Sequence, residues 1–515
     1  MHRPWFAPLV AAWFPLILSA CTGPEPGPQV TPAVEEPEPA ANPPTQVLAS
    51  YVLLASDSSG QPAAYARVIQ DDGLDCPTIA QDCSAGPSRP MTARDKPGFS
   101  AVEHCPDGGC FPVTVCEATV PFDQSSQVCL SGSAVDLPVP RMKPADILVM
   151  GDTGCKSASG EAGGACAVGG SDAAEPFGSL VKSTASTPDL ILHMGDYNYR
   201  GTPGSVPWVT SSGKHETTHH PYDAGDGADS CEQAPTDKFR TQASSRSELP
   251  DQWAIWKKEF FDPAGKLLAA SPWVFARGNH ELCSRAGPGW FYFLDAGFKP
   301  DGTQRDCPGL GGDDHPDNPF LFSVIAPMYT VNLSELSIVV LDSANACDAG
   351  VPPQVDGQDN AFVAAYKQQF GALTVPQNTT WIMSHRPFWD NDTLQATSGN
   401  GASLAGISLS LAGHQHRFES YTPIDPTGFP REVVAGNGGV ALSGDANECL
   451  EATIDEISVW KAGSTGHGFL STQFVGATGA WSGTLTDASG NTLATCSSGL
   501  IEGSVCSPAV QPCSG

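Results

Sequence analysis

The sequence predicts an α/β fold in which buried strands end in turns that carry polar residues. Three observations support this prediction. Five apolar runs in the middle of the chain each end in a turn rich in Gly, Asp, Asn or His. Segments with helical spacing lie between some of these runs, as expected where helices cover a sheet. On both flanks, short apolar runs alternate with turn residues, which is typical of β-structure.

The first residues predict export. Arg3 precedes an apolar run from Trp5 to Leu18, and Leu18-Ser19-Ala20-Cys21 follows, with small residues before the cut that a secretory signal needs. The tetrad resembles a bacterial lipobox, which implies that residues 1–21 are a lipoprotein signal peptide ending at a lipidated Cys21. Acyl chains would anchor the protein to a membrane without spanning it. The alternatives are an ordinary cleaved signal and a short membrane helix, although a span needs about 20 residues.

Residues 22–46 are rich in Pro, Glu and Ala and have almost no large apolar side chains. Such a segment cannot bury enough surface to offset its ordering entropy, so we expect a disordered linker. The remaining chain predicts an N-terminal β domain at 47–140, a central α/β domain at 141–442 and a β extension at 443–515. The expected strands of the first domain are Val47–Leu54, Ala64–Ile69, Phe111–Val115 and Val135–Val139.

The chain of 515 residues has a formal charge of −30, from 56 acidic and 26 basic side chains. A surface this acidic repels nucleic acid, so we expect no nucleic-acid binding. It also repels anionic substrates at long range. A phosphate site would therefore need a local source of positive potential, and bound metal ions are the obvious one.

The chain has 17 cysteines, and 16 remain when Cys21 is set aside. An even number in an exported chain favours disulfides over metal binding. The pairing is open, with Cys155–Cys166 and Cys105–Cys110 as guesses from proximity along the chain. The cysteines of the two flanks are expected to cross-link those flanks.

Five strand-and-turn units carry residues that can bind metals. The turns, each following an apolar run, are Gly151-Asp152-Thr153-Gly154, Gly195-Asp196-Tyr197-Asn198-Tyr199, Gly278-Asn279-His280-Glu281, His385-Arg386-Pro387 and Gly413-His414-Gln415-His416. Loops beyond strand ends are where α/β sheets bind ligands. Each turn alone is more often structural. Together they predict a two-metal site around Asp196.

The order and residues of these turns resemble the metallophosphoesterase (calcineurin-like) superfamily, and most closely its purple acid phosphatase branch. That branch carries GDxG, GDxxY, GNH followed by an acid, a lone His at a strand end, and GHxH, and all five stand here in order. Most of the superfamily has Asp-x-His at the first turn. Here Gly154 takes the place of that His, and Tyr199 compensates, as in purple acid phosphatases. The resemblance implies a four-layer αββα sandwich and makes 141–442 the catalytic domain.

Carried over residue by residue, the resemblance implies two metal ions. Metal one would bind Asp152, Asp196, Tyr199 and His416, and metal two would bind Asp196, Asn279, His385 and His414, with Asp196 bridging. A phenol has a reference pKa of about 10, so Tyr199 needs a strongly acidic metal to bind as phenolate. This favours Fe(III) in the first site, with Fe(II), Zn(II) or Mn(II) in the site rich in imidazoles.

The resemblance also implies a mechanism, in which a metal-bridging hydroxide attacks phosphorus and the metals neutralise the phosphoryl charge. His280 would protonate the leaving group, and Asp196 is counted as catalytic because it bridges. Arg386, Arg200 and Arg277 are either phosphate contacts or structural ion-pair partners.

Other segments have mainly structural interpretations. The polar loop 201–249, with His215, His219 and His220, is a solvated loop, a lid or a source of further ligands, and the first is favoured. The aromatic residues Trp253, Trp256, Phe260 and Phe261 predict a helix before Asp262-Pro263 that covers the sheet, and 361–370 predict another helix.

The sequence thus predicts a dinuclear-metal phosphoester hydrolase, resembling an acid phosphatase acting on phosphomonoesters. We expect it outside the cytoplasm, at the bacterial outer membrane or cell surface as a lipoprotein, or in the periplasm. A phosphodiesterase or nucleotidase with the same site is one alternative. A non-catalytic surface binding lipoprotein is another, less favoured because none of the seven metal-binding side chains is missing.

Overall fold

The structure is a computed structural model, and the elements described belong to the unit Pro44–Gly515. It describes residues 47–513 except 81–82, 84–87, 98–108, 126–127, 132, 134, 155–175, 200–205, 210–214, 219–250, 283–285, 298–302, 308–324, 352–353, 355–356, 360, 425–427, 444–446, 455–456, 502 and 511. The predicted signal peptide, the linker, Arg200, Cys155, Cys166 and Cys105 therefore lie outside the described residues, as does most of the loop 201–249. Cys110, the guessed partner of Cys105, is described and is disulfide-bonded. Within the described ranges, no helix is long and apolar enough to cross a membrane.

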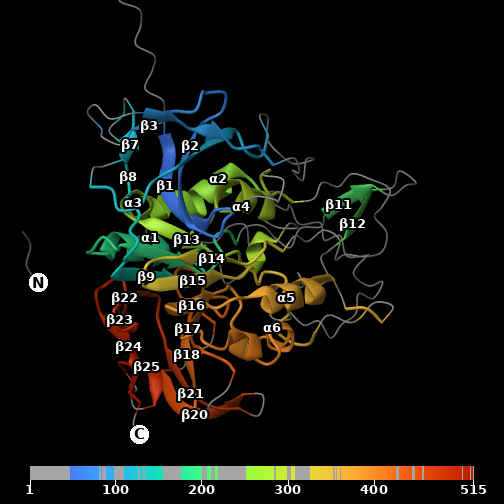
Figure 1. Cartoon of the computed structure of the whole chain (residues 1–515), viewed down its shortest axis with the longest axis vertical. Coiled ribbons are helices and arrows are strands. Elements are labelled where there is room, and N and C mark those ends of the chain that lie inside the picture. Colours follow the sequence, from blue (N-terminus) through green and yellow to red (C-terminus); the bar gives the residue numbers. More distant parts are fainter. Residues whose placement is uncertain are drawn as a thin grey trace, which may run out of the picture. The chain divides into compact units, whose positions relative to one another are not determined.

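Two large β-sheets form the middle of this unit (Figure 1). In spatial order the first contains β25 (Ser504–Pro508), β24 (Thr492–Ile501), β23 (Ala480–Thr486), β22 (Phe469–Val475), β9 (Asp146–Met150), β10 (Leu190–His193), β13 (Pro272–Phe275), β1 (Val47–Ser56), β2 (Pro62–Asp71), β6 (Val113–Thr119) and β5 (Thr92–Ala93). The second contains β14 (Tyr329–Asn332), β15 (Leu336–Val340), β16 (Thr379–Met383), β17 (Leu409–Ala412), β19 (Arg431–Ala435), β18 (Phe418–Pro423), β21 (Ile457–Ser464) and β20 (Glu448–Ile454).

The central strands of each sheet are parallel, namely β9, β10, β13 and β1 in the first and β15, β16, β17 and β19 in the second. Two small sheets accompany them. One contains β4 (Ser88–Pro90), β3 (Thr78–Ala80), β7 (Val128–Leu130) and β8 (Asp136–Leu137), and the other is a hairpin of β11 (Val206–Val209) and β12 (His215–Thr218). The hairpin lies in the segment that the sequence predicts as a polar loop.

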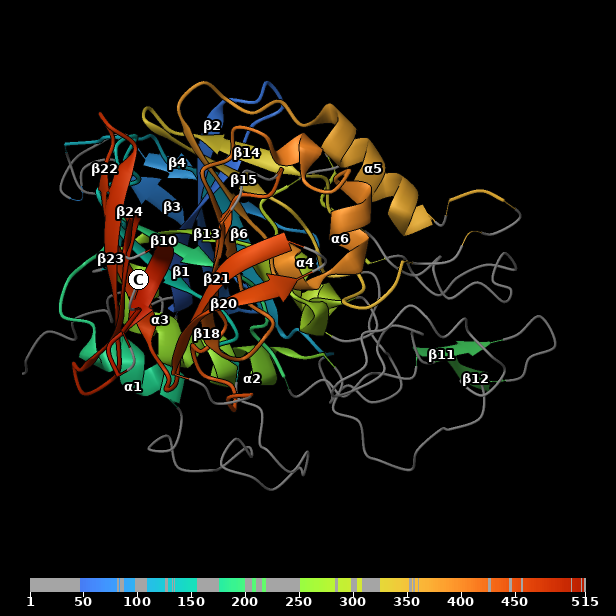
Figure 2. The same ribbon diagram turned by 90° about the horizontal axis from the view of Figure 1, so that it is seen from below.

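Helices cover the outer faces of both large sheets. The first sheet is covered by α1 (Pro176–Ser183), α2 (Trp253–Trp256), a π-helical stretch (Lys257–Phe261), α3 (Asp262–Ala270) and α4 (Gly287–Phe293). The second is covered by α5 (Ala361–Ala372) and α6 (Asp392–Thr397). Among the described residues, 3₁₀ turns lie at Asn279–Glu281, Phe388–Asp390 and Ala402–Leu404. Figure 2 shows α1–α3 well apart from α5 and α6. The predicted four-layer αββα architecture is confirmed.

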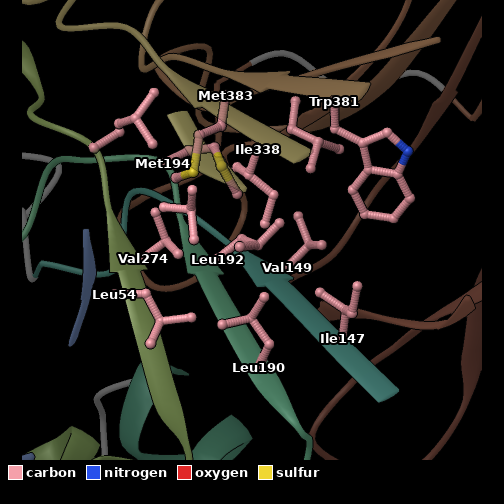
Figure 3. Close-up of a cluster of buried hydrophobic side chains, with 14 of the residues drawn as sticks. Leu54, Ile147, Val149, Leu190, Leu192, Met194, Val274, Ile338, Trp381 and Met383 are labelled. Atoms are coloured by element: carbon pink, nitrogen blue, oxygen red, sulfur yellow. The ribbon is translucent and has the colours of Figure 1, made fainter. Parts of the chain in front are cut away.

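Strand alternation explains why the sheets pack face to face. In β9, Ile147 and Val149 point into the core between the sheets, whereas Leu148 and Met150 contact the helices. Trp381 and Met383 of β16 meet them from the opposite sheet (Figure 3). Because successive side chains of a strand point to opposite faces, a strand with apolar residues at every position is buried on both.

The aromatic helix before the third turn is longer than the sequence predicts. The helical path runs through Asp262 and Pro263 to Ala270, and the proline stands directly after the point where the π-helical stretch passes into α3. Its aromatic side chains are buried against the first sheet, as predicted.

Both flanks form strands, as predicted, although the predicted strand Val135–Val139 is reduced to β8 in the four-stranded sheet. The other predicted strands, β1, β2 and β6, extend the first large sheet. β1 pairs in parallel with β13, and β22 pairs antiparallel with β9. Disulfides cross-link both flanks, at Cys76–Cys116, Cys83–Cys129, Cys449–Cys513 and Cys496–Cys506. The domain boundaries near residues 140 and 442 stay a prediction.

Candidate metal centre

The five polar turns meet at the carboxyl ends of the parallel strands of both sheets. Turns after β9, β10 and β13 supply Asp152, Asp196, Tyr199 and Asn279 from the first sheet. Turns after β16 and β17 supply His385, His414 and His416 from the second. Asp152, Asp196 and His385 are at most 1% exposed. The centre therefore lies at the seam between the two sheets.

Four of the seven predicted ligands have a left-handed backbone, with φ of 55° at Asp152, 59° at Asp196, 72° at His414 and 46° at His416. This region is uncommon for residues other than glycine, and such local strain concentrates at functional sites. Backbone hydrogen bonds hold two of these turns together, including one of 3.0 Å from the N–H of Asp152 to the carbonyl of Gly195. The strained turns direct short side chains inward from the strand ends.

Three of the side chains predicted for metal one form a compact group. The Tyr199 hydroxyl donates to Oδ1 of Asp152 at 2.9 Å and lies 3.1 Å from Nε2 of His416. The same imidazole nitrogen is 3.7 Å from Oδ1 of Asp152. A carboxylate, a phenol and an imidazole thus face one point.

The side chains predicted for metal two form a second group. Oδ1 of Asn279 lies 2.8 Å from Nε2 of His385 and 3.2 Å from Nδ1 of His414. Nε2 of His385 is 3.3 Å from Oδ2 of Asp196. This group is rich in imidazoles, as expected for a divalent transition metal.

Asp152 and Asp196 join the two groups. Ligand atoms of Asp152, Asp196 and His385 lie within 4.8 Å of one another. Burial, and then the charge of Asp196, raise the pKa of Asp152, and burial followed by the charges of Asp152 and Asp196 raises the pKa of Tyr199. Two buried carboxylates so close together repel each other unless a cation lies between them. The residues therefore fit a metal centre.

The orientation of His385 is set by the backbone of the first sheet. Its Nδ1–H donates to the carbonyl of Met194 at 2.8 Å. Because a carbonyl can only accept, this bond leaves the lone pair on Nε2, which faces Asn279 and Asp196. Metal-binding histidines are held in their tautomer in this way.

Two buried glutamates support the turns, and the sequence analysis gave them no role. Glu281 accepts hydrogen bonds of 2.9–3.2 Å from the N–H groups of Asp196, Tyr197, Asn198 and Gly278, which ties the second turn to the third. Glu259, in the π-helical stretch, accepts from the N–H of Tyr199 at 2.8 Å. π-helical turns are frequent at functional sites. The sequence did offer a signal for Glu259, because it is an acidic residue within a segment predicted to be a buried aromatic helix.

His280 lies beside the first group. Its ring centroid is 4.1 Å from that of Tyr199, its backbone N–H donates to Oδ1 of Asp196 at 3.0 Å, and the residue is only partly buried. It thus lies beside two of the predicted ligands, and the residue is partly accessible from solvent although its Nδ1 is buried.

The arginines beside the ligands form buried ion pairs. Nη1 of Arg277 is 2.9 Å from Asp342, and Nη1 of Arg386 is 2.6 Å from Asp348. Both arginines are 1% exposed. The sequence left two roles open for these arginines, phosphate contact or structural ion pair, and the contacts of Arg277 and Arg386 correspond to the second. Arg200 lies outside the described residues.

Comparison with known families identifies the class of protein. Residues 145–418 match the sequence model of the calcineurin-like phosphoesterases. This match covers more than half of the chain, so the chain belongs to the calcineurin-like phosphoesterase family. It is a metal-dependent phosphoesterase, a hydrolase of phosphoric ester bonds.

Among solved structures, purple acid phosphatase PPD1 from yellow lupin (Lupinus luteus) seeds is similar to this chain. The sequence identity is 13% and the TM-score is 0.45, with 86% of this chain and 73% of that chain covered. No curated protein sequence matches the chain.

Proposed function

We propose that the protein is a dinuclear-metal phosphomonoesterase of the purple acid phosphatase type. The observation that carries this proposal is the gathering of all seven predicted ligands into two groups joined by Asp152 and Asp196. The family match supports the phosphoester chemistry.

Asp152, Tyr199 and His416 would hold metal one, and Asn279, His385 and His414 would hold metal two, with Asp196 shared. The phenol favours Fe(III) in the first site, and the imidazoles favour Fe(II), Zn(II) or Mn(II) in the second. When bound, such a pair supplies the Lewis acidity that activates water and neutralises charge on a phosphoryl group.

We assign His280 the role of general acid. The ring of this partly buried residue lies beside the Tyr199 phenol, next to the first group of predicted ligands. The hydrogen bond from its backbone to Asp196 fixes its position relative to the shared carboxylate. A proton delivered to the leaving alkoxide by a positioned side chain contributes roughly 10²- to 10⁴-fold to the rate.

The test compares hydrolysis of p-nitrophenyl phosphate, bis(p-nitrophenyl) phosphate and a nucleoside monophosphate by the purified protein. We expect kcat/KM to be at least tenfold higher for the simple monoester than for the diester. The reverse ranking would favour a phosphodiesterase, and a preference for the nucleotide would favour a nucleotidase. Two bound metals without any hydrolysis would favour a binding protein.

His280→Ala tests the acid. Its loss in kcat should be about 10²-fold or more for an alkyl phosphate, whose leaving group needs a proton. For p-nitrophenyl phosphate, the leaving group is p-nitrophenolate, a stable anion that needs no proton. The loss in kcat should therefore be much smaller with this substrate. Equal losses with both substrates would remove His280 from this role.

We also propose that the enzyme acts outside the cytoplasm as a bacterial lipoprotein. The tetrad ending at Cys21 and the disulfides of both flanks support this. Metabolic labelling with a palmitate analogue should mark the wild-type protein and leave Cys21→Ser unmarked. Equal labelling of both would contradict lipidation at this residue.

A further inference from the structure

The imidazole of His414 has different partners on its two ring nitrogens. Nδ1 faces Oδ1 of Asn279 at 3.2 Å, within the second metal-binding group. Nε2 lies 2.6 Å from Oδ2 of Asp348, which belongs to none of the five motif turns. Nη1 of Arg386 lies 3.1 Å from the same Nε2, but it donates to Asp348 over a shorter distance of 2.6 Å. An ionised carboxylate can only accept a hydrogen bond, so its closer contact places the proton on Nε2 and the lone pair on Nδ1.

Asp348 is itself held firmly. Its Oδ1 accepts from Nη1 of Arg386 at 2.6 Å and from Nδ2 of Asn391 at 3.0 Å. Its backbone carbonyl accepts from the N–H of Asp392, and the neighbouring Cys347 is disulfide-bonded. A carboxylate fixed on several sides can orient an imidazole at little entropic cost.

The loop that carries Asp348 also supports the other imidazole of this group. Oγ of Ser343, at the start of the loop after β15, accepts from the N–H groups of His385 and Arg386 at 3.0 and 2.8 Å. The loop 341–348 thus contacts both histidines predicted for metal two. It contributes no ligand itself.

We propose that Asp348 is the positioning residue of the second metal site: it holds the Nε2–H tautomer of His414, so that Nδ1 faces the metal. The inference rests on the proposed two-metal function. Outer partners of metal-binding histidines commonly change metal affinity by about 10- to 100-fold. Asp348 acts on one site only, because its contact with the ligand set is through His414.

The test titrates Zn(II) into the metal-depleted full-length protein by calorimetry. The wild type should bind two ions, and Asp348→Ala should weaken the second by about 10- to 100-fold while the first is unchanged. Asp348→Asn keeps an oxygen that can accept from Nε2–H and should recover most of the affinity. The matched control is Asp359→Ala, whose carboxylate pairs with Lys367 at the surface, 2.8 Å away, and which should behave as wild type.

A second measurement needs neither metal nor activity. Ring ¹⁵N shifts of selectively labelled, metal-free protein report the tautomer of His414, which should be Nε2–H in the wild type. An Nδ1–H tautomer there would overturn the proposal even if Asp348→Ala failed to fold.

The zinc titration has three other outcomes that would overturn it. They are wild-type affinity in Asp348→Ala, equal weakening of both sites, and an Asn variant as weak as the Ala variant. A wild-type protein that binds only one zinc ion would instead contradict the two-metal function, so the two failures are distinguishable.

Discussion

At the scale of single residues, Gly154 and Tyr199 depend on each other. A Cβ atom at position 154 would lie 2.6 Å from Cδ2 of Tyr199 and 2.7 Å from the carbonyl oxygen of Tyr197. Real side chains do not approach so closely. The glycine is therefore what leaves room for the phenol, and a histidine at 154 and a tyrosine at 199 exclude each other in this backbone.

Gly154→Ala should consequently weaken the first metal site. The added methyl group must displace the Tyr199 ring, which we expect to lower affinity for metal one by at least tenfold, and Gly154→His should not restore a ligand. Zinc titration measures this. Gly265→Ala in α3, where a Cβ atom meets nothing within 4 Å, is the control. Full affinity in Gly154→Ala would show that the ring can move without loss.

At the scale of elements, two buried arginines hold the end of α4. Arg67 of β2 donates to the carbonyl oxygens of Phe293 and Asp295, the latter at 2.6 Å. Arg94 donates to those of Phe291 and Tyr292 at 2.9 and 3.1 Å. Cations at the carboxyl end of a helix satisfy its unpaired carbonyls and its dipole. The N-terminal strands thus stabilise the helix that follows the Asn279 turn.

Removing Arg67 should destabilise the fold strongly. The change Arg67→Met leaves Glu117, which lies 2.7 Å from the guanidinium, with one cation instead of two. Removing one partner of a buried pair costs about 3–5 kcal/mol of unfolding free energy. Urea denaturation measures it, with exposed Arg89→Met as the control. A loss below about 1 kcal/mol would mean that Arg94 alone secures α4.

A buried glutamate ties the fourth turn to its sheet. Glu432 of β19 accepts from the N–H groups of Phe388 and Trp389 and from Oγ of Ser410, at 2.8–3.2 Å. Burial raises the pKa of this carboxyl from 4.5 to about 7. The folded state therefore prefers the protonated form, and its stabilising effect is present below pH 4.5 and lost as the pH rises through 7.

Stability should fall with pH across that window, by about 3 kcal/mol from this group. Glu432→Gln cannot ionise and should show a shallower fall between pH 4.5 and 8 in urea denaturation. Asp251 has its pKa raised to about 7 by burial as well, so roughly half of the combined slope of the two groups should remain. An identical slope in wild type and variant would contradict the shift at Glu432.

At the scale of the whole molecule, the sequence predicts features that depend on neighbouring residues, such as strands and turns. It does not predict contacts between segments that are far apart in the chain. The ligand-bearing turns were found because each follows an apolar strand directly, and the strain at Asp152 and His414 is local too. By contrast, an apolar run shows that a strand is buried without showing which strand lies beside it, so the β1–β13 pairing was not predicted. The contact of Asp348 with His414 crosses 66 positions and leaves no pattern in either segment.

The predicted ligands come from both sheets, so bound metals would tie the sheets together at their carboxyl ends. Metals that bind only the folded state stabilise it by mass action, by about 4 kcal/mol per site at 1,000 times the Kd. For a chain of this size, two sites correspond to a fall in Tm of roughly 8 °C on chelation. Calorimetry with and without chelator measures this.

Hydrogen exchange should quicken on chelation at the ends of both β10 and β16. Asp196→Asn, which loses the shared carboxylate, should melt at the same temperature with and without chelator. A wild-type Tm that chelation leaves unchanged would mean that packing alone holds the two sheets together.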